Sequence, residues 1–112
     1  SNPSAQISNG EKLTFIWTEK SSSYELGYNA KIKTINSLYK VPEIKKGLED
    51  NNISEVYLCG FDTDCCVLAT AYDLFDVNIK PVVLEKLTGS TSKDKLHQPA
   101  LKMVDRNIGF VE

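Results

Sequence analysis

Residues 55–77, with the sequence EVYLCGFDTDCCVLATAYDLFDV, contain the pattern that decides the fold. Residues Glu55–Cys59 are almost continuously apolar, which is typical of a strand covered on both faces. Gly60 closes this strand, a tight polar turn follows, and a helix is expected from about Cys65 to Val77. The apolar residues of that helix recur at helical spacing and form one stripe that faces a sheet. The residues of the stripe are Val67, Leu68, Ala71, Leu74 and Phe75.

Strands and helices alternate on both sides of this unit. We expect further strands at residues 13–18, 31–35 and 80–84, a helix at 42–48 that begins at a proline, and a last helix that ends at Gly109. Hydroxyl groups of residues 90–92 are expected to cap the last helix, which Pro99 should kink or restart. Residues 1–10 are polar and are expected to be a loose end. The order predicts βαβ units.

The expected fold is therefore a single domain over residues 1–112, of class α/β, with three layers (α/β/α) and a mostly parallel sheet. The 112 residues carry 13 Lys and Arg against 15 Asp and Glu, a net charge of -2. This balance gives no basic surface for nucleic acid or for an anionic membrane. No apolar run reaches the roughly 20 residues of a membrane helix. Three cysteines, two of them adjacent, are a poor disulfide framework and favour a reducing, cytoplasmic setting.

The adjacent cysteines, Cys65 and Cys66, are the first candidates for chemistry. They stand at the start of a helix that follows the carboxyl end of a parallel strand, where sites form in open α/β sheets. The amide groups and the dipole of a helix N-terminus favour the thiolate, which is the nucleophilic form, and can bind an oxyanion. The spacing does not indicate which of the two cysteines is the nucleophile. Cys59, inside the strand, is expected to be a small buried hydrophobe. A redox pair of Cys65 and Cys66 is a less favoured alternative, because it needs a strained ring.

The turn and the helix together resemble the signature of the isochorismatase-like cysteine hydrolases. In that family a hydrophobic strand precedes G-[hydrophobic]-x-T-D-x-C-V and a helix that contains T-A. The matching residues are Gly60, Thr63, Asp64, Cys66, Val67, Thr70 and Ala71. The resemblance extends over about residues 31–112. It implies hydrolysis of an amide-type C–N bond in a small-molecule substrate through a Cys thiolate and an acyl-enzyme, with no cofactor, in a chain that commonly forms homo-oligomers.

The resemblance also assigns roles within the turn. It implies that Cys66, immediately before Val67, is the nucleophile and that Cys65 occupies a variable position. It implies a cis peptide bond between Phe61 and Asp62. This bond is expected to aim the backbone N–H of Asp62, together with that of Cys66, at the carbonyl oxygen of the substrate.

A lysine and an aspartate complete the family's site. The family's K-[ST]-x-x-S pattern resembles residues 33–37, which implies that Lys33 helps to ionise the thiol; Lys31, on the same face of a strand, is the alternative. The family's general base is an Asp near the N-terminus, but no Asp precedes Asp50. We interpret the chain as an excerpt of a longer enzyme or a degenerate paralogue, and we expect poor hydrolysis by this chain alone. The alternative function is a non-catalytic α/β domain used for oligomerisation or ligand binding.

The only histidine, His97, is expected to lie on the surface of the last helix. A Cys66/His97 dyad and a zinc site with the cysteines are alternatives, although the cysteines lack the paired spacing of zinc ligands. Nicotinamidases of the family hold a metal through an Asp and two His before the Lys. No histidine precedes Lys33, so no metal is expected and nicotinamidase activity is disfavoured. Asp64 is expected to cap the helix, rather than to form an acid–base pair with Asp62.

Overall fold

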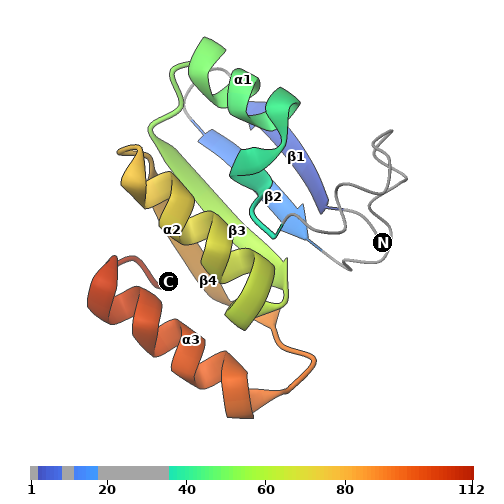
Figure 1. Cartoon of the computed structure of the whole chain (residues 1–112), viewed down its shortest axis with the longest axis vertical. Helices are drawn as coiled ribbons and strands as arrows, with labels where there is room; N and C mark the ends of the chain where they lie inside the picture. The colour runs from blue at the N-terminus through green and yellow to red at the C-terminus, as the bar shows by residue number, and fades with distance from the viewer. Residues whose placement is uncertain (1–2, 9–11, 18–35) are drawn as a thin grey trace.

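The structure, a computed structural model, describes the backbone of residues 3–8 and 12–17 and the backbone and side chains of residues 36–112. Strands and helices alternate along most of the described chain (Figure 1). In chain order they are β1 (Pro3–Ser8), β2 (Lys12–Trp17), the 3-10 helix η3 (Leu38–Lys40), α1 (Pro42–Asp50), β3 (Glu55–Phe61), the π-helical turn η4 (Thr63–Val67), α2 (Leu68–Asp76), β4 (Lys80–Gly89) and α3 (Asp94–Asn107).

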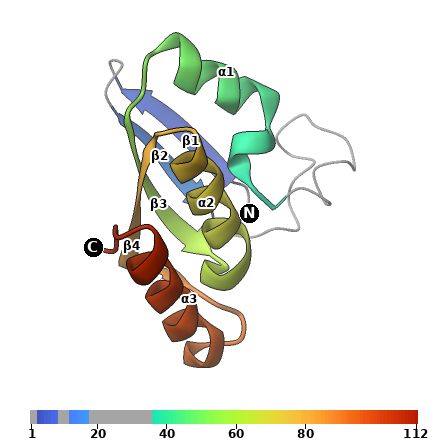
Figure 2. The ribbon, with the colours of Figure 1, turned by 60° about the vertical axis from the view of Figure 1, so that its left-hand side comes forward.

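The described strands form one sheet in the order β1-β2-β3-β4. β1 is antiparallel to β2, whereas the β2–β3 and β3–β4 pairs are parallel. After α3, Val111 adds a parallel bridge to Val83 on β4. The α/β class and the mostly parallel sheet are therefore confirmed. Because the parallel strands succeed one another in one direction across the sheet, right-handed crossovers place α1, α2 and α3 on one face (Figures 1 and 2). These helices form one helical layer of the expected arrangement.

The prediction of a loose end at residues 1–10 is wrong for β1. Its backbone pairs with β2 along its whole length, from Pro3 opposite Trp17 to Ser8 opposite Lys12. Pairing is made by backbone groups, so a polar sequence with a proline at its first position can still form an edge strand. The expected strand at 13–18 appears as β2, shifted by one residue. The expected strand at 31–35 lies outside the described residues.

The two strands beside the predicted turn are longer than expected. β3 continues through Gly60 to Phe61, and β4 continues to Gly89. After a register shift, the ladder resumes with Gly60 opposite Thr88 and Phe61 opposite Gly89. The prediction that Gly60 closes the strand is therefore wrong. The partner strand, which the local sequence does not reveal, extends the pairing.

The last helix begins and continues differently from the prediction. Lys93 stands at its N-cap without a side-chain hydrogen bond, so the expected hydroxyl cap from residues 90–92 is wrong. α3 also continues through Pro99 without restarting. Pro99 removes the hydrogen bond that would reach the carbonyl of Lys95, four residues earlier. Both residues are exposed, so water can hydrate that carbonyl.

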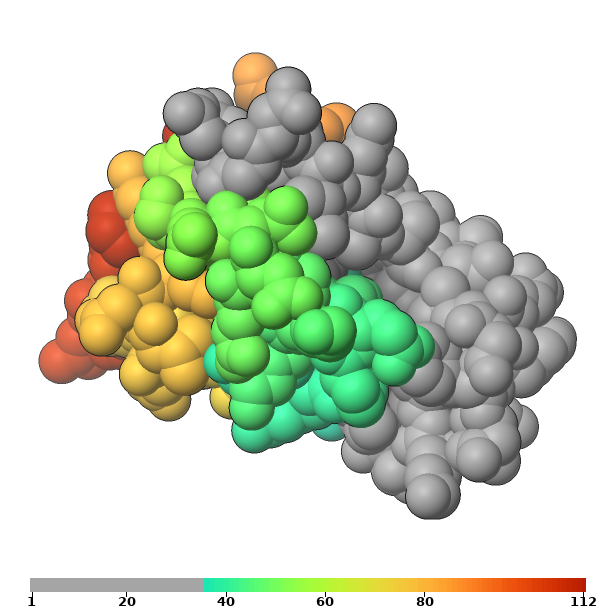
Figure 3. Space-filling model, turned by 90° about the horizontal axis from the view of Figure 1, so that it is seen from above, coloured from blue at the N-terminus to red at the C-terminus, as the bar shows by residue number. Residues whose placement is uncertain are grey.

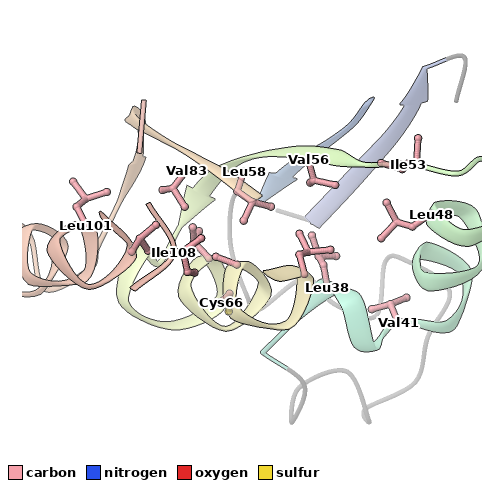
Figure 4. Packing of buried hydrophobic residues seen from close by; sticks show 14 residues of the cluster. Leu38, Val41, Leu48, Ile53, Val56, Leu58, Cys66, Val83, Leu101 and Ile108 are labelled. Atoms are coloured by element: carbon pink, nitrogen blue, oxygen red, sulfur yellow. The ribbon is translucent and has the colours of Figure 1, made fainter. Parts of the chain in front are cut away.

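A single apolar cluster fills the space between the sheet and the described helices (Figure 4). The fully buried members from β3, α2 and α3 include Val56, Leu74 and Val104. Leu38 of η3, Leu48 of α1 and Val41, which stands between these helices, belong to the same cluster. The cluster thus fixes η3, α1, α2 and α3 relative to the strands and sets the position of the turn after β3.

The helix η3 lies beside α2. Seen from above, residues 36–50 in green and α2 in yellow adjoin at the surface (Figure 3). There the Lys40 ammonium lies 3.9 Å from the Asp73 carboxylate.

Among the described helices, none is long and apolar enough to cross a bilayer.

Candidate active site

The site is built on the turn that follows β3 at its carboxyl end. The peptide bond between Phe61 and Asp62 is cis, at the position that the family resemblance indicates. The backbone carbonyl of Asp62 accepts hydrogen bonds from the N–H groups of Cys65 and Val67, both at 3.1 Å. The bond to Val67 spans five residues, so the expected helix begins as the π-helical turn η4 and becomes α-helical only at Leu68. Such turns are frequent at functional sites.

The structure distinguishes the two adjacent cysteines. Cys66 is 2% exposed and belongs to the apolar cluster, among whose buried side chains it is drawn in Figure 4. Cys65 is half-buried, and its Sγ lies 3.5 Å from Oδ1 of Asn36. Cys59 is half-buried rather than fully buried. Cys66 is therefore held inside the fold, whereas Cys65 contacts the segment that precedes η3.

Thr70 links η3 to the turn that carries Cys66. Its fully buried hydroxyl accepts the backbone N–H of Leu38 at 2.9 Å and donates to the carbonyl of Cys66 at 2.7 Å. One hydroxyl thus satisfies a donor at the start of η3 and contacts the backbone of Cys66. The family motif singles out Thr70, because it contains a threonine at this place in the helix. The motif does not reveal that Thr70 bonds Leu38, which lies 32 residues away in the sequence.

The carboxylate of Asp62 is held from the loop between β4 and α3. Asp62 is 8% exposed, and its Oδ1 accepts the backbone N–H of Thr91 at 2.9 Å. Its Oδ2 lies 3.3 Å from the hydroxyl of Thr91, which donates to it. Thr91, expected to help cap α3, instead bonds the residue that follows the cis peptide bond. Sequence reasoning missed this contact.

His97 is buried, so the prediction of a surface histidine is wrong. It is 9% exposed, and its Nδ1 lies 2.6 Å from the hydroxyl of Thr63, which is fully buried. The buried residues of α3 explain the position, because Ala100, Leu101 and Val104 follow His97 at spacings of three, four and seven. This periodicity is the signal in the sequence that places His97 on the inner face.

Asp64 does not cap the helix as expected. The N-cap position of η4 is occupied by Asp62, whose side chain makes no capping hydrogen bond to the amides of η4 and bonds Thr91 instead. Within the described part of the chain, Oδ1 of Asp64 is buried and has no hydrogen-bond partner. The π-helical start changes which amides are available at this end, so the cap geometry of an ordinary α-helix does not apply.

One expected part of the site, the lysine, is not placed by the structure. Lys33 and its alternative, Lys31, lie outside the described residues. Over the ranges that are described, no three His, Cys, Asp or Glu side chains are grouped so that they could hold a metal ion. The donor set that is described therefore does not fit a metal.

Comparison with known proteins identifies relatives of this arrangement. Residues 27–111 match the isochorismatase domain. The structure is similar to that of the nicotinamidase from Bacillus subtilis, with a TM-score of 0.65 and 29% sequence identity over 80% of this chain. It is also similar to the nicotinamidase from Staphylococcus aureus, with a TM-score of 0.58 and 30% identity over 62% of this chain. A pyrazinamidase from Pyrococcus horikoshii, solved with zinc, has a TM-score of 0.63 and 25% identity over 69% of this chain.

These matches cover only part of the similar proteins. The chain spans 51% of the Bacillus subtilis protein, 43% of the Staphylococcus aureus protein and 42% of the Pyrococcus horikoshii protein. No curated protein sequence matched the chain.

Proposed function

Because the chain belongs to the isochorismatase family of hydrolases, we propose that it carries the nucleophile of a cysteine hydrolase that cleaves an amide-type C–N bond of a small molecule. One observation carries the proposal. Cys66, the cysteine of the family motif, lies in the turn that immediately follows the carboxyl end of the parallel strand β3. That edge of an open α/β sheet is where such folds place their sites.

In the proposed reaction, the Cys66 thiolate attacks the carbonyl carbon of the amide. The C–S bond forms while the π electrons of the carbonyl move to its oxygen, and the backbone amides of Asp62 and Cys66 stabilise the resulting oxyanion. The electrons then return, the C–N bond breaks, and the nitrogen takes up the proton that the Cys66 thiol had given up, so that the amine leaves neutral. Water attacks the thioester and releases the carboxylic acid and the thiol. Lys33 assists by favouring the thiolate.

The protonation state of Cys66 decides whether this reaction can begin. A thiol has a pKa of about 8.5 in an unstructured peptide. The amides at the start of η4 favour the anion, whereas the apolar surroundings of Cys66 oppose it. A nearby ammonium group would tip the balance toward the thiolate. The proposal therefore requires a cation close to Cys66, a role that we assign to Lys33.

A second function is favoured by the burial of Cys66. At 2% exposure, Cys66 has the environment of a packing residue, and a domain that keeps this fold for oligomerisation or ligand binding needs no reactive thiol. The two functions differ in one measurable property, the reactivity of the Cys66 sulfur.

Alkylation of the unmodified chain with iodoacetamide tests the proposal. The rate at each cysteine is followed by peptide mass spectrometry over a range of pH, with Cys65→Ser as the matched control that retains Cys66. The enzyme proposal expects Cys66 to react with a pH midpoint below about 8.5, the value for an ordinary thiol. Three thiols that react slowly in the folded chain, and rapidly only after unfolding, would refute it and support the non-catalytic domain.

Nicotinamide and pyrazinamide are suitable first probes of hydrolysis. The similar structures are of nicotinamidases and a pyrazinamidase, and both probes carry a primary amide on an aromatic ring. Release of ammonia from either probe measures the proposed bond cleavage directly. We expect the 112-residue chain to release it slowly.

A further inference from the structure

The turn after β3 is held from one side by two pairs of side chains. We propose that Thr63 and His97 form a positioning pair that, together with the Asp62–Thr91 contact, fixes the backbone N–H of Asp62 for binding of an oxyanion. This inference rests on the proposed function, because it concerns the amide that would stabilise the tetrahedral intermediate. We call residues 91–97 the clamp segment.

The contacts of the clamp segment fall on two consecutive residues of the turn. Thr91 holds both carboxylate oxygens of Asp62, at 2.9 and 3.3 Å. His97 holds the hydroxyl of the next residue, Thr63, at 2.6 Å. Thr63 and His97 are separated by 34 residues in the sequence, so the bond joins the turn to α3 rather than ordering the turn internally.

Because these groups are buried, the loss of one of their hydrogen bonds would be costly. Thr63 is fully buried, Asp62 is 8% exposed and His97 is 9% exposed. A buried hydroxyl that loses its partner is left without a hydrogen bond, so the turn must either accept that cost or move. The Asp62 amide lies one residue before Thr63 in the chain. A shift of Thr63 therefore changes the direction of the Asp62 N–H.

Oxyanion stabilisation is sensitive to such a shift. A backbone donor is effective only if it is already aimed at the position that the developing charge will occupy. Displacement of an alkyl halide by a thiolate, in contrast, develops no negative charge on a carbonyl oxygen. The two reactions of the same thiol therefore separate the position of the Asp62 amide from the reactivity of Cys66.

Two electrophiles make this comparison in the full chain. Iodoacetamide reports the thiolate, because its iodide is displaced by sulfur. Pyridine-3-carbaldehyde reports the oxyanion site, because the thiolate adds to the aldehyde carbon, the C–S bond forms, and the carbonyl electron pair moves to oxygen, which takes a proton or stays hydrogen-bonded as an anion. The measured quantities are the alkylation rate and the dissociation constant of the reversible adduct.

The variants are chosen as matched pairs. Thr63→Val and His97→Gln each remove or displace one partner, whereas Thr63→Ser and His97→Asn keep a polar atom at the position of the hydroxyl or of Nδ1. We expect the first two variants to weaken aldehyde binding by about tenfold with little change in alkylation, since loss of a whole oxyanion donor costs about 100-fold or more. The second two should bind the aldehyde as the unsubstituted chain does.

The outcomes are distinct. Slow alkylation of Cys66 in the unsubstituted chain overturns the proposed function itself. Rapid alkylation without aldehyde binding, or equal aldehyde binding in all four variants, overturns the positioning role while leaving the nucleophile in place. If Thr63→Val and His97→Gln reduce both reactions equally, or if Thr63→Ser and His97→Asn fail to restore binding, the pair is only structural. Should Thr63→Val not fold, the His97→Gln and His97→Asn pair decides the result.

Discussion

Thr70 donates a hydrogen bond from its hydroxyl to the backbone carbonyl of Cys66 across 2.7 Å, from the next turn of the helix. The same oxygen accepts the backbone N–H of Leu38, so the segment before α1 depends on it as well. The helix that carries Cys66 is thus joined to η3 through one fully buried oxygen atom. Substitution of Thr70 tests how much this junction contributes to the fold.

We expect Thr70→Val to lower the free energy of unfolding by about 1–3 kcal/mol, because it leaves the buried N–H of Leu38 without an acceptor. Valine has nearly the shape of threonine, so the loss reports the hydrogen bonds rather than the volume. Urea unfolding followed by circular dichroism measures the change. Thr70→Ser keeps the hydroxyl and should lose less; an equal loss in both variants would contradict the assignment.

Leu74 and Phe75, adjacent on α2, provide a test of the core. Leu74 is fully buried, whereas Phe75 is 42% exposed. Leu74→Ala should cost about 2–5 kcal/mol of unfolding free energy, because it removes buried methyl groups and leaves a cavity. Phe75→Ala should cost clearly less, although its ring is larger. The reverse order, measured by urea unfolding, would mean that α2 packs on the sheet through a different face.

The buried oxygen of Asp64 predicts a stabilising substitution. Asp64→Asn removes the charge from a carboxylate whose Oδ1 is buried and has no partner in the described part of the chain. The free energy of unfolding should rise by about 1 kcal/mol, since a charge that is partly removed from water costs more than a neutral amide of nearly the same shape. The matched control is Asp73→Asn, which loses only the 3.9 Å ion pair with Lys40. A larger loss of stability in Asp64→Asn than in the control would show that the charge is needed.

Pro99 lies within α3 and is exposed, so its replacement should stabilise the helix. Pro99→Ala restores a backbone donor for the carbonyl of Lys95, and proline in a helix interior costs about 3 kcal/mol relative to alanine. Proline also restricts the unfolded chain, which offsets about 1 kcal/mol of this gain. An increase in the midpoint of thermal unfolding is expected for Pro99→Ala but not for the neighbouring control Gln98→Ala. No increase would indicate that the bond to Lys95 does not form.

The cysteines give a prediction for catalysis. If ammonia is released from nicotinamide or pyrazinamide, Cys66→Ser should abolish the release, because a serine hydroxyl has no comparable anion at neutral pH. Cys65→Ser should retain it, since Cys65 is half-buried and contacts Asn36 instead. Retained release in Cys66→Ser, with circular dichroism unchanged, would assign the nucleophile to another residue.

The elements predicted best from the sequence are those with a local cause. The apolar run of β3 and the helical stripe of α2 identified a parallel strand and a helix that covers it, and both are present. The proline at position 42 marked the start of α1 for the same reason, since its ring suits the first helical residue. β1 was missed because its pairing with β2 depends on a neighbouring backbone and not on its own side chains.

In the candidate site, too, some features follow from the local sequence and others only from the tertiary structure. The sequence by itself determined the α/β class and the turn that contains Cys66, because hydrophobic periodicity and a contiguous motif are properties of neighbouring residues. Only the tertiary structure decided that Asp62 bonds Thr91 and that Thr63 bonds His97. These partners are 29 and 34 residues apart and meet only because β4 and α3 return to the carboxyl end of β3. Packing of the folded chain, which no local pattern encodes, creates those contacts.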